Sequence, residues 1–310
     1  MQKIAIVIPS FNEETNIEIM VKTLHEVLQK TNYDYSILFV DDGSTDNSFK
    51  KLETIAKTDS KLFYAKLSRN FGHQNALKAG VDLVKNKVDA VITMDGDMQH
   101  PPALIINLLE KWQEGHNVVY TIRDEDKSLS YFKNKTSKMF YWLMNKLSEV
   151  EFEPGTADFR LLDKRVAQVF SDFEENELFI RGIINWVGFS QYAISYQPQE
   201  RFSGQSKYTI YKMFRFAIQG ITSFSTKPLH IAIFIGLGTT FLALISFIIY
   251  VIYSLYFGHV ISGWTSLIST VVFFGGLNLV VLGIIGIYIG KLFTQSKGRP
   301  NYIINKTNFN

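Results

Sequence analysis

The chain of 310 residues contains no cysteine, and it has little excess charge of either sign. The absence of cysteine excludes disulfide bridges and thiolate metal sites, and it fits any cellular compartment. Because 32 Lys and Arg residues face 29 Asp and Glu residues, the net charge is only +3. Binding to nucleic acid needs a dense basic face that neutralises several phosphates, so we expect no nucleic-acid partner.

We do not expect the first residues to form a signal peptide, because their apolar run is short, breaks at Pro9 and is followed by acidic residues. We interpret residues 4–8 as a buried strand. Apolar residues, in contrast, make up 46% of the chain and crowd into its last third. Two uncharged runs there, about 231–257 and 265–290, are each long enough to cross a hydrocarbon core of about 30 Å. We predict two transmembrane helices within 229–293; buried core helices are the alternative, which two such runs in succession disfavour.

The charges around the two runs indicate their orientation. The connecting loop GHVISGW has no Lys or Arg. Basic residues flank the pair on both sides: Lys207, Lys212, Arg215, Lys227, Lys291, Lys297 and Arg299. By the positive-inside rule, we expect a multi-pass protein of the cell membrane whose amino-terminal domain and tail, residues 294–310, face the cytoplasm.

Residues 208–228 are predicted to form an amphipathic helix on the membrane surface, because basic and polar residues recur at helical spacing opposite an apolar face. A surface helix packed on the core is the alternative. Within the second span, Gly286 and Gly290 have the small-xxx-small spacing that permits close helix contact, so a homo-oligomer is possible.

Residues 1–207 are predicted to form an α/β domain with a mainly parallel sheet, because short apolar runs alternate with amphipathic stretches of helical length. Strands are expected at 3–8, 35–40, 62–67, 89–94 and 117–122, with helices at roughly 13–30, 46–58, 73–86 and 101–114. Beyond residue 123 we expect a helix over 128–148, a segment EPGTADFRLLDK, further helix and a strand QYAISYQP. Ligands of such sheets bind where the strands end, so the residues after each strand are the candidate site.

Polar clusters follow the first two strands. Pro9, Phe11 and Glu13 follow the first strand, and Asp42 lies at the end of the second. A carboxylate at this edge can accept hydrogen bonds from the N–H edge of uracil or guanine, so these residues are candidates for binding a donor nucleotide, with Asp42 on the base. The alternative for DDGSTD is a turn and helix cap without further function.

The fourth strand is followed by Asp95, Gly96, Asp97 and Gln99. Two carboxylates separated by one glycine can converge on a hard cation through oxygen ligands, and Gln99 can add another. We therefore predict a Mg²⁺ or Mn²⁺ site that bridges the diphosphate of a nucleotide donor. His100 is beside this cluster, but direct ligation is disfavoured because such cations prefer oxygen.

Basic residues at several positions are candidates for binding phosphate. Arg69 follows the third strand, where a helix also opens, and the neighbouring His73 is open to either a chemical or a purely structural role. A glycine-containing loop before the amphipathic helix carries Arg201, Ser206 and Lys207. Such a loop suits a lipid phosphate or a donor diphosphate, and anchoring to anionic lipids is an alternative that does not exclude either.

Taken together, the motifs resemble those of the polyprenyl-phosphate glycosyltransferases of glycosyltransferase family 2, which are related to dolichyl-phosphate mannose synthase and include the bacterial bactoprenol glucosyl transferases. The resemblance spans PSFNEE, VDDGSTD, SRNFGHQNA, MDGDMQHPP, ADFRLLDK, ERFSGQSKY and the two apolar runs. It implies a GT-A nucleotide-diphospho-sugar fold, catalytic Asp95 and Asp97 at the metal, and Asp158 near the sugar or acceptor. It also implies phosphate contacts for Arg123, Arg201 and Lys207. The chain departs from the family in having Gly96 where alanine is frequent, and a second downstream phosphate-binding arginine is not obvious.

The function implied by this resemblance is metal-dependent, inverting transfer of a single sugar, with glucose from UDP-glucose foremost, to polyprenyl (undecaprenyl) phosphate for cell-envelope glycan modification. Because a lipid phosphate is largely ionised near neutral pH, no strong base is needed, and we expect Asp158 to orient hydroxyl groups of the acceptor or sugar. A role of Asp158 as a general base is the alternative. A processive polysaccharide synthase is the alternative enzyme, although two spans are few and RGIINW has the wrong spacing for its acceptor motif. A non-catalytic membrane scaffold is the alternative outside enzymes.

Overall fold

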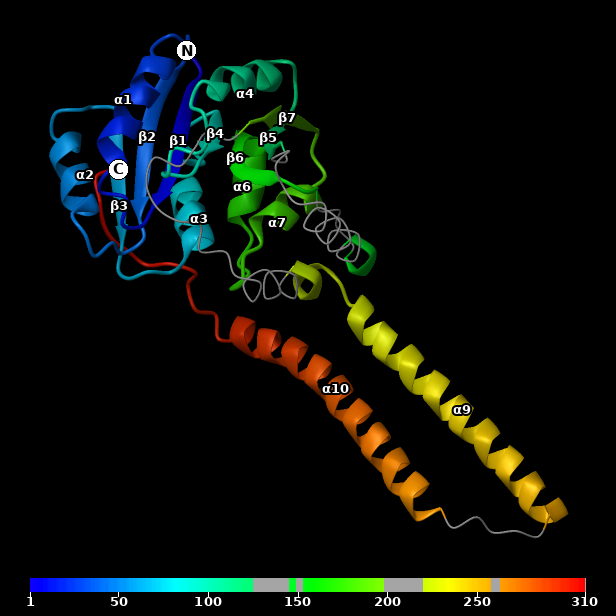
Figure 1. Ribbon diagram of the computed structural model, residues 1–310. Coiled ribbons are helices and arrows are strands. Elements are labelled where there is room, and N and C mark those ends of the chain that lie inside the picture. The colour runs from blue at the N-terminus through cyan, green and yellow to red at the C-terminus, as the bar shows by residue number, and fades with distance from the viewer. Residues whose placement is uncertain (125–144, 149–152, 198–219, 258–262, 310) are drawn as a thin grey trace.

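The computed structural model describes residues 1–124, 145–148, 153–197, 220–257 and 263–309. Its α/β domain is built on an eight-stranded sheet with helices on both faces, and two long helices project from one end of that domain (Figure 1). The strands are β1 Lys3–Ser10, β2 Asp34–Asp41, β3 Leu62–Leu67, β4 Ala90–Thr93, β5 Val118–Arg123, β6 Thr156–Asp163, β7 Gln191–Tyr196 and β8 Ile304–Thr307. All five strands predicted before residue 123 are present.

The sheet has the order β7-β5-β6-β4-β1-β2-β3-β8. Its strands are mainly parallel, and β6 and β8 run antiparallel to their neighbours. The central strand β1 is apolar on both sides: Ile4, Ile6 and Ile8 belong to one core cluster, and Ala5 and Val7 belong to the other. A parallel strand covered on both faces needs such a continuous apolar run, which is why the sequence identified it.

Two helical layers complete the domain. One face of the sheet is covered by α1 Ile17–Leu28, α2 Ser48–Ala56 and α4 Leu104–Gln113, and the other by α3 His73–Val84, α6 Lys164–Ser171 and α7 Ile180–Trp186. The four helices predicted before residue 123 are thus present, each shorter than its sequence pattern. The carboxyl ends of β1, β2 and β4 lie side by side at the middle of the sheet, where the strand order reverses direction.

Two strands were not anticipated. The segment EPGTADFRLLDK contains β6, which enters the sheet between β4 and β5. The segment 294–310, for which the sequence predicts only a tail, contains β8, which pairs with β3 and covers that edge of the sheet. The ring of Phe309 then packs edge-on against Phe63, with ring centroids 4.8 Å apart. The carboxyl-terminal segment therefore belongs to the α/β domain.

The two projecting helices are α9 Lys227–Phe257 and α10 Trp264–Ser296. Both are long and apolar enough to cross a membrane, with mean hydropathy of 2.4 and 2.3 in their most apolar stretches. At most 6% of those stretches is buried within the protein. Their length and composition indicate membrane association. The predicted helices at 128–148 and 208–228 lie mostly outside the described residues; 145–147 and 220–224 are helical.

Candidate active site

A cavity of about 780 Å³ opens at the carboxyl ends of β1, β2 and β4. Its lining contains nine of the residues predicted from the sequence: Pro9, Phe11, Glu13, Asp42, Asp95, Asp97, Gln99, Arg123 and Asp158. Arg69 does not line this cavity; its guanidinium stacks on the ring of Phe71, 4.1 Å from the centroid. Arg201, Ser206 and Lys207 lie outside the described residues, so their assignment to phosphate stays a prediction.

The loops after β1 and β2 are fastened to each other. The backbone N–H of Asn12 donates to Ser44 Oγ at 2.9 Å, and the N–H of Thr45 donates to Asn12 Oδ1 at 2.8 Å. Gly43 adopts a φ of +71°, and a Cβ at this position would lie 2.6 Å from the carbonyl carbon of Arg69. Glycine is therefore required where the loop after β2 approaches the backbone of the loop after β3. The resulting rigid rim holds the wall of the cavity at which the donor base is expected.

Asp42 is almost fully buried, and its carboxylate accepts two backbone hydrogen bonds. Phe71 N–H donates to Oδ1 at 2.7 Å, and Gly72 N–H donates to Oδ2 at 2.9 Å. Burial raises the pKa of Asp42, while these two hydrogen bonds oppose the rise. Each carboxylate oxygen can accept more than one hydrogen bond, so contact with a base remains possible. The structure thus gives Asp42 an additional task, which is to fix the turn that precedes α3.

The paired carboxylates after β4 have the properties expected of a cation site. Asp95 Oδ1 is buried and accepts no hydrogen bond from the described residues, although His73 Nε2 lies 3.3 Å away. Asp97 Oδ1 accepts the N–H of Gln99 at 3.1 Å, across the left-handed turn at Met98 (φ 63°). The described part of the chain holds no group of three His, Asp or Glu side chains placed to enclose a metal ion. A Mg²⁺-like ion would therefore need further oxygens from water or from a bound diphosphate, which is a usual coordination for that ion.

His100 is fully buried next to this pair, and each of its ring nitrogens has a polar neighbour. Nδ1 accepts the backbone N–H of Asp95 at 3.2 Å, and Nε2 lies 3.2 Å from Arg123 Nη2. Burial lowers the pKa of His100, so the ring is neutral near pH 7. Arg123 also donates through Nε to the hydroxyl of Tyr196 at 3.0 Å. Nδ1 of the ring thus anchors the loop that carries Asp95.

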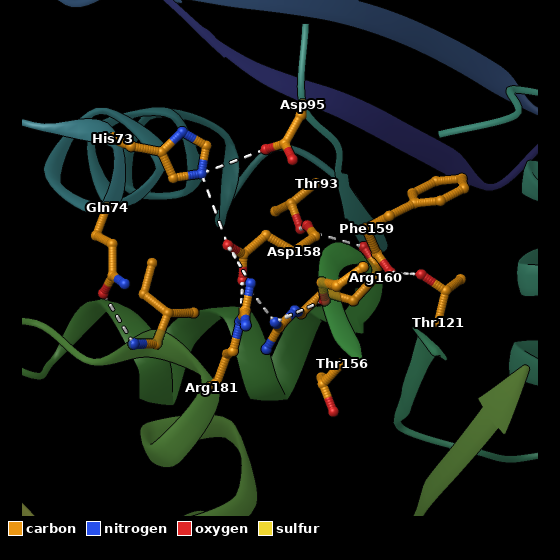
Figure 2. Close-up of polar contacts among 12 residues, drawn as sticks. His73, Gln74, Thr93, Asp95, Thr121, Thr156, Asp158, Phe159, Arg160 and Arg181 are labelled. Carbon is orange, nitrogen blue, oxygen red and sulfur yellow. Dashed lines mark hydrogen bonds and ion pairs between the residues drawn. The ribbon is translucent and has the colours of Figure 1, made fainter. Parts of the chain in front are cut away.

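Asp158, on β6, lies at the centre of an ion-pair cluster (Figure 2). Arg160 Nη2 lies 2.9 Å from Asp158 Oδ1. Arg181 donates through Nε to Oδ1 at 3.2 Å and through Nη2 to Oδ2 at 3.3 Å. His73 Nε2 lies 3.8 Å from its Oδ2, so this histidine faces both Asp95 and Asp158. Burial would raise the pKa of Asp158, but the charges of Arg181 and Arg160 outweigh it and hold the pKa well below its usual range.

Sequence reasoning did not assign roles in this cluster to His73, Arg160 or Arg181. The sequence does carry a signal that Arg160 lies beside Asp158. The two residues are two positions apart, and residues so spaced share one face of a strand. His73 follows the third strand, and the sequence left its role open between chemistry and structure. Arg181 had no such signal, since it reaches the cavity from the first turn of α7.

Comparison with known proteins places these features in a family. The sequence profile described as glycosyl transferase family 2 matches residues 5–176. The chain belongs to this family. It is 40% identical over 307 residues to the uncharacterized glycosyltransferase YkcC of Bacillus subtilis (strain 168), covering 98% of this chain and 93% of that protein. It is 39% identical over 305 residues to the bactoprenol glucosyl transferase of Shigella phage SfV, covering 97% of this chain and 98% of that protein.

Among solved structures, mannosyl-3-phosphoglycerate synthase from Rubrobacter xylanophilus aligns with a TM-score of 0.47 and 16% identity, covering 70% of this chain and 71% of that one. The family, the mainly parallel α/β domain and the enzyme class predicted from the motifs are confirmed. This family 2 protein is a glycosyltransferase with a mainly parallel α/β domain and two apolar helices that can cross a membrane.

Proposed function

We propose that this glycosyltransferase moves a single sugar from a nucleotide donor to a polyprenyl phosphate, with UDP-glucose as donor and undecaprenyl phosphate as acceptor. One observation carries the proposal: the likeness to a bactoprenol glucosyl transferase extends over 97% of the chain and so includes both apolar helices. Two such helices would hold the transferase at the membrane, where a lipid acceptor lies.

The donor fits the wall formed by the ends of β1, β2 and β4. Phe11, with 44% of its surface exposed, offers a face for the base, and the remaining acceptor capacity of Asp42 suits the N–H edge of uracil. Asp95, Asp97 and Gln99 would hold Mg²⁺ or Mn²⁺ together with the donor diphosphate. When bound, such a cation neutralises the charge that collects on the departing nucleoside diphosphate.

The reaction follows as a direct displacement with inversion. An oxygen of the acceptor phosphate attacks the anomeric carbon, and the bond from that carbon to the diphosphate breaks on the opposite side. No proton has to be removed, because the second pKa of a phosphate monoester is about 6 and the dianion is abundant at neutral pH. Asp158, which is ionised and engaged by two arginines, is a poor base and serves to hold those arginines.

The placement of the domain relative to the helices supports a cytoplasmic reaction. The α/β domain, including β8 after α10, lies at one end of the helix pair, so both outer ends of the pair lie on the same side of a membrane (Figure 1). Basic residues flank those ends and are absent from the connecting loop. We therefore propose a catalytic domain over 1–207, an interfacial segment over 208–228 and two spans within 229–293.

The test uses the full chain, purified in detergent, with undecaprenyl phosphate as the acceptor. Labelled UDP-glucose, UDP-N-acetylglucosamine, UDP-galactose and GDP-mannose are supplied in turn as donors. Each reaction is run with Mg²⁺, with Mn²⁺ and with EDTA. A lipid carrying one glucose, formed only with the metal, is the expected result, and the anomeric coupling of the product by NMR reports inversion. A polymer would instead identify a processive synthase. No lipid-linked sugar from any donor would refute the proposal and favour a scaffold.

A further inference from the structure

We propose that the end of α7 which carries Trp186 lies in the lipid headgroup layer of the membrane and holds the cavity beside that layer. The inference rests on the function proposed above, because it takes α9 and α10 as the anchor. Trp186 is the last residue of α7, and 63% of its surface is exposed. Its ring packs edge-on against Phe173, with ring centroids 5.7 Å apart. Tryptophan is enriched at membrane–water boundaries. Because single exposed apolar residues are ordinary on soluble proteins, the position of Trp186 relative to the two helices is decisive.

Two lysines mark the level at which the helix pair leaves the hydrocarbon core. Lys227 is the first residue of α9, and Lys291 is the first charged residue of α10. Both contact the α/β domain or the segments joined to it. Lys291 Nζ lies 3.4 Å from Glu177 Oε2 and 3.0 Å from Ser223 Oγ. Lys227 Nζ donates to the carbonyl oxygen of Ser148 at 2.8 Å. Because a lysine at the end of a span extends its ammonium group to the headgroups, the residues that contact these two lysines lie at headgroup level.

The loop between α6 and α7 places Phe173, and with it Trp186, close to the same level. Gln295 donates through Nε2 to the carbonyl oxygen of Glu174 at 2.9 Å. Gln295 is four residues beyond Lys291, which is about 6 Å along a helix. The headgroup layer is about 5–8 Å thick on each side of the hydrocarbon core. Since Phe173 directly precedes Glu174, the two packed rings are within reach of that layer.

The face of α7 that carries Trp186 is also the face that meets the segment leading into α9. A Cβ on Gly182 would lie 2.4 Å from the ring of Phe224, which belongs to the helical turn before α9. Trp186 is four residues after Gly182, and residues so spaced lie on one face of a helix. The hydroxyl of Tyr288 donates to the carbonyl oxygen of Ser225 at 2.7 Å, which places this turn beside α10. Contacts with both anchor helices therefore put Trp186 on the membrane side of the domain.

Helix α7 thereby connects the membrane surface to the cavity. Its second residue, Arg181, lines the cavity, and its last residue faces the headgroups. The phosphate of a polyprenyl acceptor lies in the headgroup layer, because its chain is held in the hydrocarbon core. The contact is apolar: the loop before α7 carries Glu174, Glu175 and Glu177, which anionic lipids would repel. Placing α7 in this layer shortens the path of the acceptor phosphate to the cavity.

The absence of native cysteine allows a single spin label to test this contact. Trp186→Cys, Phe247→Cys and Ile19→Cys are each labelled with a nitroxide in the full chain and placed in phosphatidylcholine nanodiscs. Phe247, 62% exposed within α9, is the lipid control. Ile19, 37% exposed on α1 and away from the helix pair, is the water control (Figure 1). Accessibility of each label to oxygen and to a water-soluble nickel complex is measured by electron paramagnetic resonance. We expect the ratio of the two at position 186 to lie between those of the controls.

A label at position 186 that is as open to nickel as the label at position 19 would overturn the inference and leave the proposed function intact. Spin–spin broadening between labels at position 186 would also overturn it, because a second copy of the chain would then cover Trp186. If the label at position 247 is itself open to nickel, α9 does not cross the bilayer, and the proposed anchor fails together with the inference. The measurement needs no sugar transfer, so a chain that binds the membrane through Trp186 but transfers nothing would refute the function alone.

Steady-state kinetics test the consequence for the reaction, with undecaprenyl phosphate incorporated into the same nanodiscs. Trp186→Ser should raise the KM for the lipid several-fold and leave the KM for the nucleotide sugar unchanged, because Trp186 does not line the cavity. Trp186→Phe, which keeps an apolar ring, should stay near the wild type. Tyr192→Ser is the matched control: Tyr192 is 38% exposed on β7, where its ring contacts His116. An equal acceptor KM in Trp186→Ser and Tyr192→Ser would contradict the role of α7 in holding the cavity at the membrane.

Discussion

Replacing Asp158 with asparagine should destabilise the α/β domain, because the buried Arg160 would lose its counter-ion. The Arg160 side chain is 2% exposed and lies 2.9 Å from Asp158, whose side chain is 13% exposed. Removing one partner of a buried ion pair costs about 3–5 kcal/mol. Asp95 also attracts Arg160, so we expect the lower end, about 3 kcal/mol. For a domain of 150–250 residues this corresponds to a fall in Tm of about 6–12 °C.

Thermal unfolding of the purified full chain, followed by tryptophan fluorescence, measures this effect. Asp34→Asn is the matched control: its ion pair with Lys61 is about 40% exposed on both sides, and such surface pairs contribute about 0–1 kcal/mol. Arg160→Met in the Asp158→Asn background should recover part of the lost Tm by removing the unpaired cation. If Asp158→Asn unfolds at the same temperature as Asp34→Asn, Arg160 does not depend on Asp158 and the reasoning is refuted.

Three further predictions concern the metal pair, the pH profile and β8. Asp97→Ala should abolish metal-dependent transfer to the lipid with Tm unchanged, and undiminished activity in the labelled-lipid assay would contradict its role. Since the pKa of Asp158 lies well below its usual range, activity should fall only as pH drops through about 6, where the acceptor phosphate gains a proton. This acidic limb of kcat/KM should persist in Asp158→Asn. Phe309→Ala should cost about 3 kcal/mol and lower the Tm, because its ring is buried against Phe63.

The sequence predicts the amino-terminal half of the fold well because its strands are apolar on both faces. β1 and β4 read as continuous apolar runs, and the helices between them show a clear apolar face. β8 has the sequence INKT, which has no such pattern, and it is held by pairing with β3, more than 230 residues away. Pairing over such a separation leaves no local signal, so a tail was the natural expectation for that segment.

The site residues also differ in whether their positions can be predicted from the sequence. Asp42, Asp95 and Asp97 directly follow strands, so their convergence can be predicted from strand order alone. His73 and Arg181 depend on how α3 and α7 pack, which requires the Gln74 to Ile180 contact and the fit of Phe224 on Gly182. Arg69 follows β3 as Asp42 follows β2, but its side chain folds over Phe71, and sequence position does not reveal that choice.

A carboxylate that is not needed as a base still has a reason to be at position 158, because it holds Arg181 in a fixed orientation. If this is its task in the reaction, Asp158→Asn and Arg181→Gln should raise the KM for the lipid phosphate to a similar extent, since in either variant the contact between residue 158 and the guanidinium is lost. The two changes would then remove one interaction, and neighbouring residues that act together are not additive. We therefore expect the acceptor KM of Asp158→Asn/Arg181→Gln to stay within about twofold of that of Arg181→Gln alone. Multiplicative effects would instead show that Asp158 contacts the substrate by itself.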